Sequence, residues 1–103
     1  HDTHLSEISK IREMIHATPV DGFAGCCIAI KDMDQRETIK TIDLPVLVIA
    51  GAEDPGTTPA MNKLIADSIP GAEYIELPAS AHFCNVQAAD GFNATLADFL
   101  LKH

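Results

Sequence analysis

The run from Pro45 to Ala50 constrains the fold of this chain more than any other segment. Val46 to Ile49 are all apolar, three of the six residues in the run are branched at Cβ (Val46, Val48 and Ile49), and no polar residue interrupts them. A continuous apolar run is typical of a parallel strand that is buried on both faces. The turn residues from Gly51 to Gly56 end the strand. We therefore expect a central strand of a parallel sheet.

The residues after this strand predict one β-α-β unit followed by a terminal helix. Thr58 and Pro59 provide an N-cap and a first-turn proline, and Pro70-Gly71 ends that helix. A second strand is expected over 72–77 and a last helix over about 87–101. The fold class is therefore α/β, part of a doubly wound parallel sheet whose first strand needs a further neighbour. Apolar residues expected to be buried by the two helices are Met61, Leu64, Ile65, Ile69, Phe92, Leu96, Phe99 and Leu100.

The opening part of the chain has a helical pattern. One helix, capped by Asp2 or Thr3, should run to about His16, and a second should run from about Asp21 to the polar residues after Ile30. A short third helix is expected over 36–41. Cys26 and Cys27 are interpreted as small buried residues of the second helix. We expect residues 1–43 to be a helical segment and 44–103 the β-α-β-α part.

Composition and charge exclude several classes of protein. The chain has 103 residues, 47% of them hydrophobic, which is typical of a globular domain or part of one. Its net charge of -8 disfavours binding to nucleic acid or to anionic membranes. No apolar run approaches the ~18 residues of a membrane span. The three cysteines have neither a disulfide nor a zinc spacing, which favours a reducing cytoplasm.

Asp54 and His82 are the residues whose positions indicate chemistry. Each lies in a loop that follows an expected strand, and in parallel sheets catalytic groups collect outside the carboxyl ends of strands. Neighbouring strands would bring the two side chains together. An aspartate that accepts the Nδ1 proton of a histidine fixes its tautomer and makes the other ring nitrogen a general base. We therefore expect a catalytic acid and base here.

Other interpretations of these residues remain open. Asp54 in an Asp-Pro-Gly sequence is also ordinary turn chemistry, and His82 could be a surface histidine. Cys84 is a candidate nucleophile, although residues two apart near a strand end usually point differently. His1 and His4 make at most a weak metal site at a chain terminus.

The section around these residues resembles the closing part of an α/β-hydrolase, in which the acid and the histidine follow the nucleophilic serine along the chain. The similarity lies in Pro45 to Asp54 and in Ala81 to Val86. More narrowly, the chain is similar to 3-oxoadipate enol-lactonases. The segments that carry this closer resemblance are Thr18 to Cys27, Lys31 to Asp34, and Thr57 to Met61.

The resemblance implies that Asp54 is the triad acid, that His82 is the general base, and that residues before Asp43 end a cap domain. It implies no metal or organic cofactor. The nucleophile is missing, because no G-x-S-x-G elbow occurs and the oxyanion donors that accompany it are absent. Gln87 and Ala88 also stand where relatives often have an acidic residue and a proline.

We therefore expect the carboxyl-terminal portion of a serine hydrolase that converts an enol-lactone to 3-oxoadipate in aromatic-compound catabolism. Its partners would be a small ester or lactone substrate and the remaining half of the hydrolase, in the same or a separate chain, and the 103 residues alone should be inactive. The alternatives are another carboxylesterase or carbon–carbon bond hydrolase, and a non-catalytic module or complementing subunit.

Overall fold

The structure is a computed structural model that describes residues 5–103. Contacts between residues divide the chain into two units at the bond between Gln35 and Arg36. The assignment of residues 1–43 to a cap domain and of residues 44–103 to a hydrolase core stays a prediction.

The first unit consists of two helices. Helix α1 spans Leu5–Ala17 and α2 spans Val20–Lys31, close to the expected bounds. Pro19 lies between them with an extended backbone (φ -61°, ψ 136°), because its ring fixes φ and it has no N–H to continue the first helix. The expected capping residues Asp2 and Thr3 lie outside the described residues.

Most apolar residues of the first unit are exposed in this chain, and Ile8 and Ile11 are half-buried. The interpretation of Cys26 and Cys27 as buried residues is wrong, because both are exposed and neither α1 nor α2 contains a buried residue. Phe23 is 65% exposed and Ile28 is 73% exposed. Among residues 5–103, no helix is long and apolar enough to cross a membrane. Two helices with so much apolar surface need a further partner to bury it.

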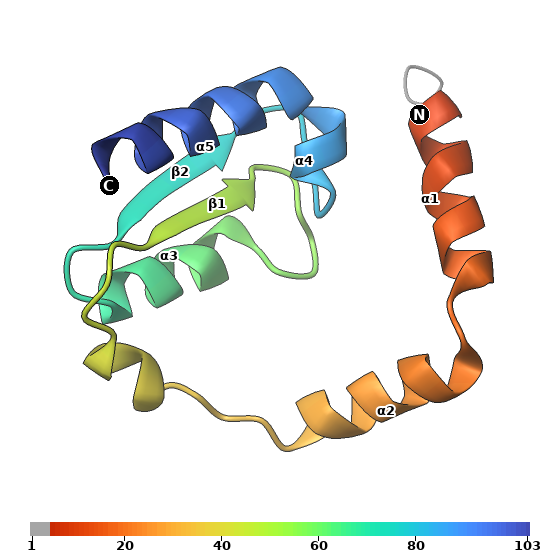
Figure 1. Ribbon diagram of the computed structural model, residues 1–103, viewed down its shortest axis with the longest axis horizontal. Coiled ribbons are helices and arrows are strands. Elements are labelled where there is room, and N and C mark those ends of the chain that lie inside the picture. Colours follow the sequence, from red (N-terminus) through yellow and green to blue (C-terminus); the bar gives the residue numbers. More distant parts are fainter. Residues whose placement is uncertain (1–4) are drawn as a thin grey trace. The chain divides into compact units, whose positions relative to one another are not determined.

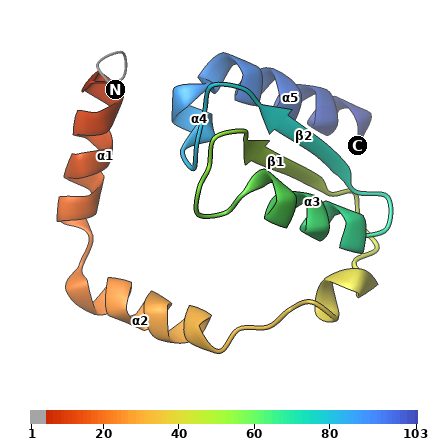
Figure 2. The ribbon, with the colours of Figure 1, turned by 180° about the vertical axis from the view of Figure 1, so that it is seen from behind.

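The second unit is built on a parallel sheet of two strands, β1 (Leu47–Gly51) and β2 (Glu73–Leu77). The pairing runs from Leu47 opposite Glu73 to Gly51 opposite Leu77. Helix α3 (Pro59–Ser68) connects the strands, and α5 (Ala89–Lys102) ends the chain. Figures 1 and 2 show α3 and α5 on opposite faces of the sheet. This arrangement confirms the expected β-α-β unit and its terminal helix.

Side chains of β2 alternate between these two helices, as the sequence predicts. The Tyr74 hydroxyl donates to the Pro59 carbonyl at 3.2 Å, and Lys63 lies 5.8 Å from the centre of the Tyr74 ring, so Tyr74 faces α3. Leu77, three residues on, lies on the other face and approaches Gly91 of α5. The period of two residues therefore assigns each face of the strand to one helix.

The start of α3 follows from its capping residues. The Thr58 side chain accepts a hydrogen bond from the Met61 backbone N–H at 3.3 Å, and Pro59 is the first helical residue. These two features satisfy an N–H that the helix itself cannot pair, and place a proline where its missing N–H does no harm. The predicted cap is confirmed.

Two helix predictions need correction. The helix expected over 36–41 is a shorter 3-10 helix, η2 (Thr38–Thr41). The last helix does not begin at Gln87, because a four-residue helix α4 (Cys84–Gln87) comes first. Ala88, at φ -125° and ψ 48°, then breaks the helical path before α5. A residue with these backbone angles cannot continue an α-helix.

The buried core of the second unit is small. It contains Ala50, Ala66, Ile69, Leu77 and Cys84, together with two polar residues, Asp54 and Ser80. β1 is paired on one side only, so its first three residues are half-buried and the expectation of burial on both faces is wrong for this chain. Expected core residues that are instead exposed are Met61, Leu64, Ile65, Leu96 and Leu100, while Phe92 and Phe99 are half-buried.

Candidate active site

Asp54 and His82 lie at the same edge of the sheet. Both strands point toward the end of the sheet where α4 lies (Figure 1), and Asp54 follows β1 while His82 follows β2. The carboxylate Oδ2 of Asp54 is 2.9 Å from Nδ1 of His82. The prediction that neighbouring strands bring these two side chains together is confirmed.

Four hydrogen bonds hold the Asp54 carboxylate. Its Oδ1 accepts backbone N–H groups of Gly56 at 2.9 Å and Thr57 at 3.1 Å. Its Oδ2 accepts the Thr57 hydroxyl at 2.7 Å as well as the contact from His82. Asp54 is thus both a turn residue and the partner of His82, so the two interpretations of this residue are compatible. A carboxylate has about four acceptor positions, and all are used.

These contacts keep the Asp54 carboxyl ionised. Its side chain is almost fully buried, which by itself would raise its pKa. The Thr57 hydroxyl, then His82, and then the backbone N–H groups of Gly56 and Thr57 outweigh burial and lower the pKa from 3.8 to about 2. An ionised Asp54 cannot donate a proton, so in a hydrogen bond between the two residues the donor is Nδ1 of His82.

The lowered pKa of Asp54 predicts a loss of stability in acid. A carboxyl group whose pKa is lower in the folded state stabilises the fold fully above its ordinary pKa of 3.8, and this contribution disappears as the pH falls toward about 2. We expect the free energy of unfolding, measured by denaturant titration, to fall across this range. In the Asp54→Asn variant the fall should be smaller, and an identical pH dependence in both proteins would contradict the assignment.

The loop that carries His82 is fixed by residues that the sequence interpretation did not single out. Gly51 lets the loop pass close over β1, because a Cβ at this position would lie 2.1 Å from the Ala81 carbonyl oxygen. Ser80 is fully buried, and its hydroxyl donates to the Leu77 carbonyl at 2.9 Å. The Gln87 side chain accepts the Ala81 N–H at 2.8 Å. Gln87 was noted only as a departure from relatives, yet it holds the residue before His82.

Thr57 is the other residue that sequence reasoning missed. Its hydroxyl lies 2.7 Å from Asp54 Oδ2 and 3.1 Å from His82 Nδ1. A usable signal was present, because an aspartate in a turn often accepts backbone N–H groups of the residues that follow it, which brings those residues against its carboxylate. The site therefore contains three residues, two from the loop after β1 and one from the loop after β2.

No nucleophile is placed in the second unit. The hydroxyls of Ser68 and Ser80 donate to backbone carbonyls, those of Leu64 and Leu77. Cys84 is only 8% exposed, so its thiol is not presented to a substrate. The His82 side chain is 66% exposed, which leaves its second ring nitrogen accessible. Within residues 5–103 no three potential ligands among His, Cys, Asp and Glu gather to hold a metal ion. The possible pair His1 and His4 lies outside the described residues.

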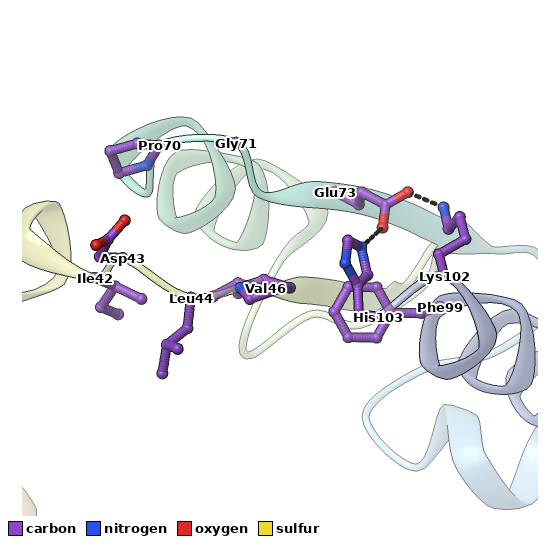
Figure 3. Close-up of a pocket in the computed structure, with 11 residues that line it drawn as sticks. Ile42, Asp43, Leu44, Val46, Pro70, Gly71, Glu73, Phe99, Lys102 and His103 are labelled. Carbon is purple, nitrogen blue, oxygen red and sulfur yellow. Dashed lines mark hydrogen bonds and ion pairs between the residues drawn. The ribbon is translucent and has the colours of Figure 1, made fainter.

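A cavity of about 570 Å³ lies away from this site (Figure 3). Its wall includes Val46 and Glu73, at the amino ends of the two strands, whereas Asp54 and His82 follow the carboxyl ends. Glu73 pairs there with Lys102, and His103 lies 3.9 Å from its other oxygen. The cavity is therefore at the opposite end of the sheet and cannot hold a substrate for the Asp54–His82 pair.

The chain is similar to hydrolases of known sequence and structure. The chain is 36% identical over 86 residues to 3-oxoadipate enol-lactonase 2 of Acinetobacter baylyi, which covers 84% of the chain and 32% of that protein. The solved enol-lactonase of Burkholderia xenovorans LB400 is 36% identical and matches 97% of the chain and 38% of its own length, with a TM-score of 0.91. A pimeloyl-[acyl-carrier protein] methyl ester esterase of Neisseria meningitidis is 29% identical over 94% of the chain and 44% of that protein.

The similarity covers most of this chain but only part of each relative. The chain spans about a third of the length of the first of these relatives. No protein-family model matches it. The two enol-lactonases nevertheless align with most of the chain, and both the parallel β-α-β unit and the helices before it are part of the match to the solved structure. The chain belongs to the α/β-hydrolase fold family and has 3-oxoadipate enol-lactonases among its relatives.

Proposed function

We propose that Asp54 and His82 are the acid and the general base of a serine hydrolase whose nucleophile lies outside these 103 residues. The observation that carries the proposal is the 2.9 Å contact between Asp54 Oδ2 and His82 Nδ1 at the carboxyl edge of a parallel sheet. Ionised Asp54 keeps the proton on Nδ1 and leaves the lone pair of Nε2 available. A histidine arranged in this way can accept the proton of a serine hydroxyl as that hydroxyl attacks a carbonyl.

The proposed reaction is hydrolysis of an enol-lactone ester to 3-oxoadipate, a step in the breakdown of aromatic compounds. The serine attacks the lactone carbonyl while His82 takes its proton, and His82 then returns this proton to the departing oxygen. Water releases the product from the acyl-enzyme with His82 again acting as base. The sequence similarity to enol-lactonases of two genera supports this substrate class.

The remainder of such an enzyme is the proposed partner of this chain. β1 has β2 on one side and an unpaired edge on the other. Unpaired strand edges and large exposed apolar side chains are normally covered in folded proteins. Exposed residues that such a partner would cover are Val20, Phe23, Ile28, Met61 and Leu64. A polypeptide with the nucleophile elbow and the missing strands would therefore complete both the sheet and the active site, whether it belongs to the same chain or to another.

A second candidate function is hydrolysis of a different ester by the same residues. The similarity to the pimeloyl-[acyl-carrier protein] methyl ester esterase of Neisseria meningitidis favours it. The Asp54–His82 pair would act in the same way on either substrate, because the acid and base set the reaction while the pocket sets the substrate.

The test uses this chain combined with a polypeptide that carries the serine elbow, here called the completed enzyme. We expect turnover of an enol-lactone, weaker turnover of aryl esters, and no turnover by the 103-residue chain alone. His82→Ala should abolish the activity, and His103→Ala, at the opposite end of the sheet, should retain it. Aryl ester turnover without lactone turnover would favour the second candidate. Ester hydrolysis that survives His82→Ala would refute the proposed site.

A further inference from the structure

The Thr57 hydroxyl stands between the two groups of the proposed pair. Its oxygen is 2.7 Å from Asp54 Oδ2 and 3.1 Å from His82 Nδ1, while these two atoms are 2.9 Å apart. Three polar atoms are therefore within hydrogen-bond distance of one another. Asp54 and Thr57 lie in the loop after β1 and His82 lies in the loop after β2, so the two contacts to His82 depend on the pairing of these strands.

Counting protons leaves two possible arrangements of this triangle. A threonine hydroxyl has one proton, a neutral imidazole has one, and an ionised carboxylate has none. In the first arrangement Thr57 and His82 Nδ1 both donate to Asp54 Oδ2, and the lone pair of His82 is on Nε2. In the second, Thr57 donates to Nδ1, the imidazole proton is on Nε2, and His82 cannot act as a base toward a serine.

The environment of Asp54 favours the first arrangement. The residue is 6% exposed, so water cannot readily replace a missing donor at Oδ2. In the second arrangement Oδ2 would lose the donors from both Thr57 and His82 while the buried carboxylate kept its charge. A buried carboxylate whose Oδ2 has no donor is costly, so the Thr57 proton goes to Asp54.

The rest of Thr57 holds this hydroxyl in place. Its backbone N–H donates to Asp54 Oδ1 at 3.1 Å, and its carbonyl accepts the Asn62 side chain at 3.0 Å. The first contact ties the residue to the carboxylate and the second ties it to the first turn of α3. Both are backbone contacts, and a change of side chain at position 57 leaves their donor and acceptor present.

We propose that Thr57 is a positioning residue whose hydroxyl donates to Asp54 Oδ2, keeps this carboxyl ionised and aligned with Nδ1–H of His82, and so leaves Nε2 free to act as base. Its catalytic consequence rests on the proposed hydrolase function, but the arrangement of protons does not. When His82 becomes an imidazolium, the same oxygen keeps a lone pair directed at Nδ1–H. Thr57 then helps Asp54 to stabilise the positive charge.

The proton arrangement can be measured in the 103-residue chain by nitrogen-15 NMR, which distinguishes the two neutral tautomers of histidine. The chain has five histidines, and comparison with His82→Ala assigns the signals of His82. We expect Nδ1–H as the main tautomer. In Thr57→Val, Nδ1–H should stay the main tautomer, because His82 is then the only donor left to Asp54 Oδ2. The pKa of Asp54, followed by carbon-13 NMR, should rise from about 2 toward 3.8.

Two further variants separate positioning from packing. Thr57→Ser restores the hydroxyl without the methyl group and should restore the low pKa of Asp54. Thr58→Val removes the neighbouring hydroxyl, which caps α3, and should lower stability by destroying the cap while both NMR readouts stay unchanged. If Thr57→Val does not fold, Thr57→Ala gives the same readouts with a smaller side chain.

The outcomes for Thr57 and for the hydrolase proposal are independent. An unchanged Asp54 pKa in a folded Thr57→Val chain, or Nε2–H as the main tautomer of His82 in the parent chain, would overturn the role of Thr57, whatever the completed enzyme does. A raised Asp54 pKa in Thr57→Val together with a completed enzyme that hydrolyses no ester would refute the function and leave the proton arrangement standing. If both hold, Thr57→Val in the completed enzyme should lower kcat about tenfold to a hundredfold with KM little changed, and Thr57→Ser should recover it.

Discussion

Asp54→Asn should lower kcat of the completed enzyme about 10⁴-fold. The asparagine can still accept the backbone N–H groups of Gly56 and Thr57, so the turn after β1 should keep its shape. Its amide carries no charge, and an NH₂ group directed at His82 would donate to Nδ1 and hold the imidazole in the tautomer with its proton on Nε2. His82 would then have no lone pair for the serine proton. Steady-state rates on the enol-lactone measure the effect.

Asp67→Asn is the matched control for this substitution. Asp67 lies in α3 and pairs with Lys63 at 2.6 Å on the surface, four residues away on the same helix. Such pairs contribute about 0.3–0.5 kcal/mol, so the variant should fold and keep the parent kcat. A completed enzyme that loses less than tenfold on Asp54→Asn, or as much on Asp67→Asn, would show that Asp54 is not the acid of the site.

The parts of the site that could be predicted from the sequence depend on local chemistry and on strand order. The apolar run before Gly51 identifies β1, and Thr58 with Pro59 identifies the start of α3. Once two parallel strands are neighbours, the loops that follow them must meet, which placed Asp54 beside His82. None of these inferences requires knowledge of distant packing.

Burial could not be predicted in the same way. Helical spacing of Met61, Leu64 and Ile65 shows that α3 has an apolar face, but not which residues cover it. In this chain α3 buries Ala66 against the sheet and leaves that face exposed. The same reasoning explains Cys26 and Cys27, whose small apolar side chains were expected to be covered. An apolar pattern in the sequence shows that a helix face needs to be covered, but it does not show whether the segment that covers it is present.

Hydrogen bonds between loops were also beyond the sequence. Thr57 and Gln87 are common polar residues. Their roles depend on the course of the loops around them, which the spacing of apolar residues in the sequence does not determine. The His82 loop is particularly constrained, because Ser80, Ala81 and Gln87 all hold it over the end of β1. The geometry of the Asp54–His82 pair therefore depends on the close approach of the His82 loop to β1. Gly51 is the residue that permits this approach.

Gly51→Ala should therefore destabilise the second unit by roughly 3 kcal/mol or more, because the added atom overpacks a site with no free space. The new Cβ would lie 2.1 Å from the carbonyl oxygen of Ala81 and 2.8 Å from that of Ser80. Both are backbone atoms, so no side-chain rotation can relieve the clash. The His82 loop must move away from β1, which should also weaken the contact with Asp54 and raise the pKa of Asp54 from about 2 toward 3.8.

Gly91→Ala is a control that should change the stability of the chain in the opposite direction. Gly91 lies in α5, and a Cβ there would be 3.5 Å from a methyl carbon of Leu77, an ordinary contact distance. Replacing a glycine inside a helix by alanine should stabilise the chain by up to about 1 kcal/mol. Denaturant unfolding of both variants measures the difference. If Gly51→Ala is as stable as the parent chain and keeps the Asp54 pKa low, the close passage of the His82 loop over β1 does not control the geometry of the pair.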